Sequence, residues 1–205
     1  MKTSKLFGLL LVGVMALAAL IGAGNASATN LYRYTTPAAN DRVAVGTELV
    51  VTLESETSLL WKDTGGLAHD TCTGSEWKGK LERDTASGVH ASGKTTSLSF
   101  SGCSHTTTVL APGEFEIRSI AGTTNGTLIS KGTRVTTKST VFGISCVGNT
   151  GAGTTLGTIT GAKSSTAYAT IDINGVVTKE NGCGDSTVTG SYLITSPTGL
   201  TVEAS

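Results

Sequence analysis

Alternation of apolar and polar residues is the feature that most restricts the fold of this chain. In TELVVTLESE, Leu49, Val51 and Leu53 point to one side, while Glu48 and Thr52 point to the other. This two-residue period is typical of a half-buried strand. EFEIRSI and TGSYLITS repeat the pattern further along the chain, and helix signals are nearly absent after the first 28 residues. The sequence therefore predicts an all-β fold.

The first 28 residues have the layout of a secretory signal peptide. Lys2 and Lys5 precede a long apolar run, and Ala26-Ser27-Ala28 forms a small-x-small cleavage site. A membrane anchor is the alternative, but glycines interrupt the run, which is about as long as a minimal spanning helix. We expect a signal helix at 1–28 and one secreted or cell-surface domain at 29–205.

Composition adds a second argument for strands in the mature chain. Threonine is its most frequent residue, and a β-branched polar side chain suits the solvent face of a strand. Many short strands with glycine-containing turns predict an antiparallel β-sandwich or a partly closed barrel. Asn174-Gly175 and Asn125-Gly126 are predicted to be hairpin turns.

The balance of charges excludes some partners. Basic and acidic residues number 15 each, and loss of Lys2 and Lys5 leaves the mature chain weakly acidic. A chain of this kind has no electrostatic footprint for nucleic acid or an anionic membrane. No second apolar run is long enough to span a bilayer. The expected partner is an unidentified extracellular ligand, with a glycan or the cell wall as candidates.

Two of the four cysteines lie close to histidines, which raises the question of a metal site. His69 stands three residues before Cys72, and His105 stands two residues after Cys103. Two cysteines and two histidines could bind zinc. However, paired cysteines in an exported protein form disulfides, and Cys103-x-His105 is closer than zinc ligands usually lie. We predict a disulfide, no metal, no cofactor, and histidines in solvent-facing loops.

The pairing of the cysteines follows from their spacing. Four cysteines allow three pairings. Cys72 and Cys103 are separated by a glycine-broken polar stretch and a strand, and so are Cys146 and Cys183. The parallel spacing favours Cys72–Cys103 and Cys146–Cys183. The same spacing is also consistent with a domain built of two similar halves. The alternative is chance similarity within a Gly/Thr-rich chain.

A series of short stretches runs along the mature chain: AHDTCTGSEWKGK, LSFSGC, APGEFEI, TNGTL, FGISCVG, LGTITG, ATIDINGVV and YLITSPTGLTV. In order and spacing they resemble a large family of uncharacterised secreted proteins from soil actinobacteria. That family usually ends in an SPTPLYV-type tail, from which this chain departs at Gly199–Val202. The resemblance implies export and a four-cysteine framework. It implies no activity and no catalytic residue.

Catalytic motifs are missing from the sequence. GNTGAGTTLG lacks the Lys-Ser/Thr of a phosphate loop, and GISCVG lacks the second glycine of a nucleophile elbow. We therefore expect a non-catalytic extracellular binding or adhesive module. The alternative is a secreted hydrolase that acts on polysaccharide through paired carboxylates. It requires glutamates to converge in a cleft beside a tryptophan, the candidates being Glu54, Glu56, Glu114 and Glu116 with Trp61 or Trp77.

Aromatic residues make up 5% of the chain, so we expect most of them in the core, where they bury the largest area per residue. The residues predicted to be buried are Trp61, Phe100, Phe115, Phe142 and Tyr192. Exposed, aligned rings would instead indicate a carbohydrate platform.

Overall fold

The computed structural model describes residues 28–34, 41–63, 69–83, 90–138, 145–180 and 183–204. The predicted signal helix and Phe142 lie outside these ranges. The described strands are β1 (Thr29–Arg33), β2 (Asp41–Arg42), β3 (Glu48–Leu53), β4 (Leu59–Asp63), β5 (His69–Arg83), β6 (Ala91–Cys103), β7 (Thr106–Ala111), β8 (Glu114–Ser119), β9 (Gly126–Lys131), β10 (Arg134–Lys138), β11 (Ser145–Asn149), β12 (Thr154–Thr160), β13 (Ala169–Glu180), β14 (Ser186–Ser196) and β15 (Leu200–Ala204).

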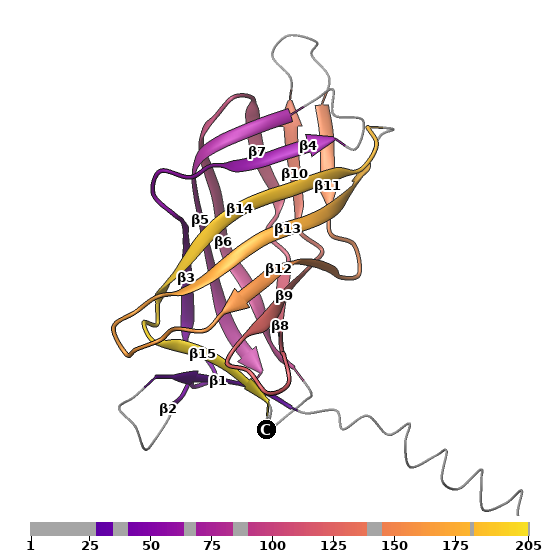
Figure 1. Ribbon diagram of the computed structural model, residues 1–205. Helices are drawn as coiled ribbons and strands as arrows, with labels where there is room; N and C mark the ends of the chain where they lie inside the picture. Colours follow the sequence, from indigo (N-terminus) through magenta and orange to yellow (C-terminus); the bar gives the residue numbers. More distant parts are fainter. Residues whose placement is uncertain are drawn as a thin grey trace, which may run out of the picture.

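Eight of these strands close into an antiparallel barrel (Figure 1). The ring runs β3-β5-β6-β8-β9-β12-β13-β14 and returns to β3. The all-β prediction is confirmed. The sandwich alternative is wrong, and the barrel is closed rather than partly closed. Because β3 from the first half of the chain pairs with β14 from the second, both halves belong to one barrel.

Shorter strands extend the barrel upwards in the view of Figure 1. β4 follows β3 and pairs with the same two neighbours, β14 and β5. β7 leads into β8, β9 leads into β10, and β11 leads into β12. β10 joins β7 to β11, and β11 joins β13. The result is a tall up-and-down barrel, in which β6 and β7 are successive strands that share no ladder.

Each of the three strand pairs β7–β8, β9–β10 and β11–β12 is interrupted by a short break, and the three breaks lie at the same level of the barrel wall. Thr133 Oγ1 donates to the carbonyl of Pro112 at 2.8 Å, and the Thr133 amide donates to Thr150 Oγ1 at 2.9 Å. The Gly132 amide donates to the carbonyl of Gly151 at 2.8 Å. Both glycines have positive φ, 65° and 52°, which other residues adopt only at a cost. The breaks are thus hydrogen-bonded to one another and form a belt across the part of the wall made by β8, β9 and β12.

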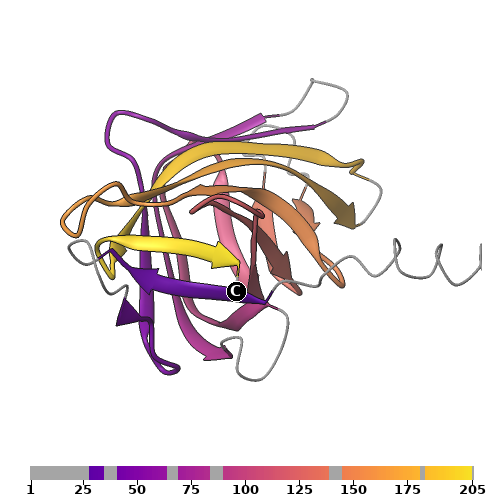
Figure 2. The ribbon, with the colours of Figure 1, turned by 60° about the horizontal axis from the view of Figure 1, so that its bottom comes forward.

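The lower end of the barrel is covered by a small sheet in the order β15-β1-β2. Figure 2 shows β1 and β15 lying across this end. Leu31 and Val202 are buried in the common core, and the Val202 amide donates to the carbonyl of Thr124 on the β8–β9 turn. β1 begins at Thr29, which would be the first residue after the predicted cleavage site.

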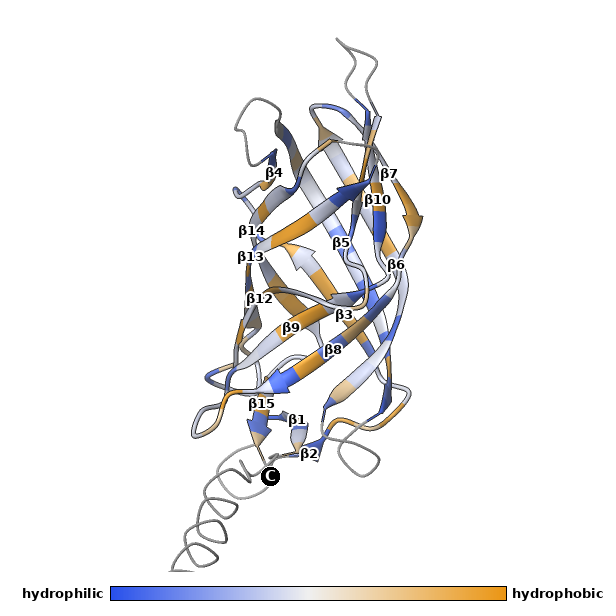
Figure 3. Ribbon diagram, turned by 90° about the vertical axis from the view of Figure 1, so that its right-hand side faces the viewer, coloured by the Kyte–Doolittle hydropathy of each residue, from blue (hydrophilic) through white to orange (hydrophobic). Residues whose placement is uncertain are grey.

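The period-2 pattern that predicted strands also decides which side chains face inward. Leu49 and Val51 of β3 are buried, whereas Glu48 is exposed. Figure 3 shows the same alternation of hydrophobic and hydrophilic residues along barrel strands such as β8. Within the described ranges, no helix has the length and hydropathy needed to cross a bilayer.

The predicted hairpin at Asn174-Gly175 is wrong, because both residues lie in the middle of the continuous strand β13. A Cβ atom on Gly175 would lie 2.9 Å from the Cα of Leu156 on β12. β12 has a register irregularity beside this point, between Thr155 and Gly157. The glycine therefore allows a close approach between neighbouring strands, and the second Asn-Gly pair ends a longer turn, with Gly126 as the first residue of β9.

We expect Gly175→Val to destabilise the barrel by roughly 1–3 kcal/mol, since the new side chain must displace backbone of β12. Val176→Ala, a change at the exposed neighbouring position, should alter the free energy of unfolding by less than about 0.5 kcal/mol. Urea denaturation of both variants measures the difference. A neutral Gly175→Val would contradict the close approach.

Candidate functional site

The predicted disulfides Cys72–Cys103 and Cys146–Cys183 are both present. Cys72 on β5 and Cys103 on β6 are directly paired across the ladder. Zinc coordination requires thiolates, so a disulfide removes both sulfurs from any metal site built on His105. Disulfides are typical of an oxidising compartment such as the cell exterior.

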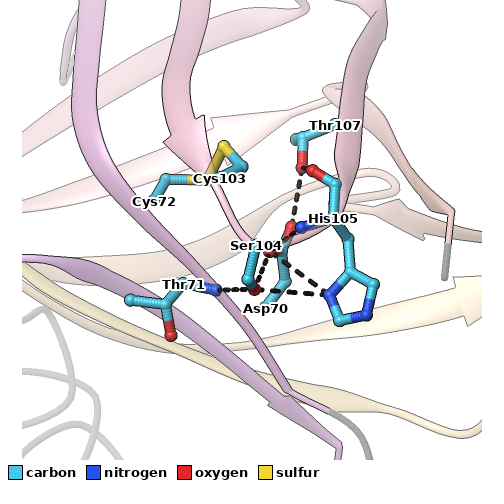
Figure 4. The surroundings of a disulfide bond; sticks show 7 residues. All are labelled: Asp70, Thr71, Cys72, Cys103, Ser104, His105 and Thr107. Atoms are coloured by element: carbon cyan, nitrogen blue, oxygen red, sulfur yellow. Dashed lines mark hydrogen bonds and ion pairs between the residues drawn. A yellow bond between two sulfur atoms is a disulfide. The ribbon is translucent and has the colours of Figure 1, made fainter. Parts of the chain in front are cut away.

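Asp70, the neighbour of the first disulfide, organises the turn between β6 and β7 (Figure 4). Its carboxylate accepts hydrogen bonds from Ser104 Oγ and Thr107 Oγ1, each at 2.7 Å, and from the His105 amide at 3.0 Å. Burial alone would raise the pKa of Asp70, but these hydrogen bonds from Thr107, Ser104 and His105 outweigh it and lower that pKa. Asp70 is therefore a buried anion that fixes this turn.

The residues around Asp70 include the members of a Ser-His-Asp triad but not its geometry. Ser104 Oγ and Asp70 Oδ1 both approach the same nitrogen of His105, Nδ1, at 3.3 and 3.5 Å. In a triad the serine and the aspartate interact with opposite ring nitrogens. Because Ser104 also donates directly to Asp70, its hydroxyl is not activated as a nucleophile. His105 lies in the turn and is half-buried, while His69 lies at the start of β5.

We expect Asp70→Asn to lower the free energy of unfolding at pH 7 by about 1–3 kcal/mol, because the buried hydrogen bonds to a charged acceptor are weakened. The pKa of Asp70 is depressed, so its contribution is present above the unfolded pKa and is lost as the pH falls. The difference between the variant and the wild type should therefore narrow from about pH 5 towards pH 2. Urea unfolding across this range measures it, and a constant difference would contradict this role.

The structure does not bring together the glutamates on which the hydrolase alternative depends. Glu54 and Glu56 lie in the turn between β3 and β4, whereas Glu114 and Glu116 lie on β8. β5 and β6 stand between these strands in the barrel wall.

Glu116 belongs to an ion-pair cluster on the outer wall. It is 5% exposed and pairs with Arg118 Nε at 2.5 Å and with Lys131 Nζ, beside a polar hollow of about 420 Å³. Burial alone would raise the pKa of Glu116, but Lys131 and Arg118 outweigh it and lower the pKa. A general acid of a glycosidase needs a raised pKa, so this carboxylate does not suit that role.

A second space, inside the barrel, has a different chemistry. It is a cavity of about 120 Å³ that extends from β4 and β5 to the belt of strand breaks. Most of its wall is apolar. The aliphatic residues that line it include Val51, Leu59, Leu98, Leu128, Val135, Leu156, Ile171, Ile173, Val177 and Val188, and the aromatic ones are Trp61, Trp77, Phe100, Phe115 and Tyr192.

Aromatic rings meet edge to face around this cavity. The ring centroids of Trp61 and Phe100 are 6.1 Å apart, and those of Trp77 and Phe115 are 5.0 Å apart. The prediction of burial is confirmed for Trp61, Phe115 and Tyr192, while Phe100 is half-buried. Trp61 and Trp77 line the interior, so they are not available for an exposed carbohydrate platform.

Two residues of the cavity wall carry a buried polar atom without a hydrogen-bond partner among the described residues. These atoms are Trp61 Nε1 and Ser75 Oγ, whereas Trp77 Nε1 donates to Thr95 Oγ1 at 2.9 Å. Burial raises the pKa of Tyr192 to about 12, and the neighbouring Ser75 hydroxyl offsets part of the rise. Ser75 Oγ thus lies close to the phenol of Tyr192, although the two hydroxyls do not form a hydrogen bond of normal geometry. An unsatisfied buried group typically costs about 1–3 kcal/mol.

Sequence reasoning placed the rings of this site in the core but missed the cavity. The pattern of β5 gave no signal for it, because the positions in phase with Trp77 are mostly small or polar, such as Thr73, Ser75 and Gly79. Comparison with protein-family models, with curated proteins and with solved structures found no match.

Proposed function

We propose that this protein is an exported, non-catalytic binding protein of the extracellular space or the cell surface, and that it holds a small, mostly apolar ligand inside its barrel. The observation that carries the proposal is the mostly apolar cavity inside the barrel, whose wall also carries a few hydroxyl side chains such as those of Ser75, Thr95 and Ser130. Ligand sites commonly combine an apolar wall with a few polar groups that fix orientation.

The size of the cavity favours a ligand of few atoms. Its volume of about 120 Å³ is below the roughly 300–1,000 Å³ of sites for drug-sized molecules. Apolar cavities of roughly 150 Å³ in proteins take up benzene or xenon. A glycan, with its many hydroxyl groups, would leave most of them unpaired against such a wall.

Export is supported by two independent features. The leader has the three parts of a signal peptide, and the two disulfides suit an oxidising environment. The hydrolase alternative gains no support, because Glu54 and Glu56 lie on a different part of the barrel from Glu114 and Glu116, and the charge of Glu116 is neutralised by Lys131 and Arg118.

Titration of the oxidised mature protein with toluene, indole and acetophenone tests the proposal. Since both tryptophans line the cavity, binding should change tryptophan fluorescence in a saturable way. It should also raise the Tm, because a ligand that binds the folded state stabilises it.

A matched pair of variants locates the binding. Ser75→Leu fills the cavity and should abolish both effects, while Thr73→Leu adds the same side chain at an exposed position of β5 and should retain them. No response from any of the three probes, or equal binding by Ser75→Leu, would contradict the proposal. Binding of both variants to cell-wall preparations would instead indicate an adhesive outer surface.

A further inference from the structure

The route between solvent and the cavity can be inferred from the pairing of the strands, on the premise of the binding function proposed above. We propose that small apolar molecules enter and leave the barrel through the seam between β6 and β7, where residues 96–102 and 106–112 run side by side without a shared ladder.

The seam is the one unpaired step in the described part of the upper barrel ring. Above the belt this ring consists of β4, β5, β6, β7, β10, β11, β13 and β14. Neighbouring strands share an antiparallel ladder at every step from β7 through β10, β11, β13, β14, β4 and β5 to β6. The last step, from β6 to β7, has no ladder, and the pairing of β6 with β8 ends at Lys94.

Both ends of the seam are fixed. At the lower end the Thr95 amide donates to the carbonyl of Gly113 at 3.1 Å. At the upper end the turn that Asp70 organises connects the two strands. Between these ends the described residues include no backbone hydrogen bond from β6 to β7. The seam is therefore a bounded stretch of unpaired strand edge.

The backbone of β6 directs polar groups into the seam. Cys103 faces Cys72 at a Cα–Cα distance of 3.9 Å, and so short a distance marks a pair that does not exchange ladder hydrogen bonds. Such pairs alternate with hydrogen-bonded ones, so Ser97, Ser99 and Ser101 also turn their amides and carbonyls away from β5 and towards β7. These three serines are exposed, so solvent reaches this edge.

The cavity lies directly behind the seam. Leu98 and Phe100 alternate with the exposed serines, line the cavity and are half-buried, so solvent reaches part of each side chain. Thr95 and Pro112 line the cavity at the lower end of the seam. At the seam the cavity is therefore closed by side chains and not by a backbone ladder.

Opening the upper ring at any other step costs more. Separation of two laddered strands breaks backbone hydrogen bonds, whereas separation along the seam breaks none. Local openings of a protein concentrate where few such bonds must break. The lower end of the barrel is covered by the sheet β15-β1-β2 (Figure 2). A rotamer change of Leu98 or Phe100, with a small spreading of the two strands, is thus the easiest path for a small molecule.

A disulfide across the seam tests this route. Ser99 and Leu110 are both exposed, and Ser99 precedes the end of β6 by as many residues as Leu110 follows the start of β7, so Ser99→Cys with Leu110→Cys bridges the two strands. Glu76→Cys with Ser99→Cys is the matched control, because it uses the same serine but bridges β6 to β5, where the two residues are already paired. Non-reducing peptide mapping verifies each new bridge beside the two native ones.

Stopped-flow tryptophan fluorescence with toluene measures the exchange. We expect the bridged seam to lower both the association and the dissociation rate constant about tenfold or more, while Kd stays within about twofold, because entry and exit use the same path. The β5–β6 bridge should leave both rate constants within about twofold of the wild type. Equal exchange in the wild type and the bridged seam would overturn this inference and leave the binding function standing. No saturable binding of toluene to the wild type would refute both proposals.

Amide hydrogen exchange of the wild type decides if the seam bridge does not close. The amides of Ser97, Ser99 and Ser101 should exchange much faster than those of Leu98 and Phe100, which pair with β5. Protection of the three serine amides as strong as that of their neighbours would show that the seam is paired, and the proposed route would be wrong.

Discussion

Removal of the Cys146–Cys183 disulfide, by replacing both cysteines with alanine, is expected to lower the free energy of unfolding by roughly 3.5–4 kcal/mol. The bridge closes a loop with a sequence separation of 37. In the chain-entropy model, such a cross-link restricts the unfolded chain, so its loss favours unfolding. That is a large fraction of the roughly 5–15 kcal/mol typical of a domain.

The Cys72–Cys103 bridge has a sequence separation of 31. It should contribute a similar free energy if its main effect is to restrict the unfolded chain. Urea denaturation of the oxidised protein and of each double-alanine variant measures the two contributions. EDTA should change nothing, since the sulfurs are bonded to each other. A loss below about 1 kcal/mol for both bridges would contradict this account of stability.

Phe115→Ala is expected to destabilise the barrel by about 3–5 kcal/mol. The Phe115 side chain is 2% exposed and meets Trp77 edge to face at 5.0 Å. It occupies a socket made by two glycines: a Cβ atom on Gly79 would lie 2.7 Å from its ring, and one on Gly93 would lie 2.8 Å from it. Glycines have no side chain that could relax into the vacated space, so the cavity would remain.

Tyr168→Ala is the matched control, because Tyr168 is 47% exposed and its loss should change stability by less than about 0.5 kcal/mol. Urea unfolding followed by tryptophan fluorescence gives both values. Equal effects of the two substitutions would show that the ring of Phe115 does not pack in this socket.

The strand content and the disulfide pairing could be predicted because their signals are local or are matched in spacing. The choice between a sandwich and a barrel could not, because inward and outward residues alternate with the same period in both. Closure depends on the pairing of β3 with β14, for example Thr52 with Leu193, which are far apart in the sequence. No local pattern specifies that pairing.

The wrong prediction of a hairpin turn at Asn174-Gly175 has a similar cause. The dipeptide fits a hairpin turn by its local preferences, but the approach of Leu156 on β12 requires a glycine in a straight strand. The candidate site also could not be predicted from the sequence. Trp61 Nε1 and Ser75 Oγ stand out because they are buried without a hydrogen-bond partner in the described part of the chain, and burial and hydrogen bonding depend on the closed barrel.

Pressurising crystals of the oxidised protein with xenon tests the central claim, an apolar ligand cavity inside a closed barrel, most directly. Xenon enters apolar cavities of this size and gives an anomalous signal that needs no assumption about the natural ligand. We predict one strong peak inside the barrel, bounded by Trp61, Trp77 and Tyr192. A barrel interior without xenon, filled by ordered water or by collapsed side chains, would contradict the claim.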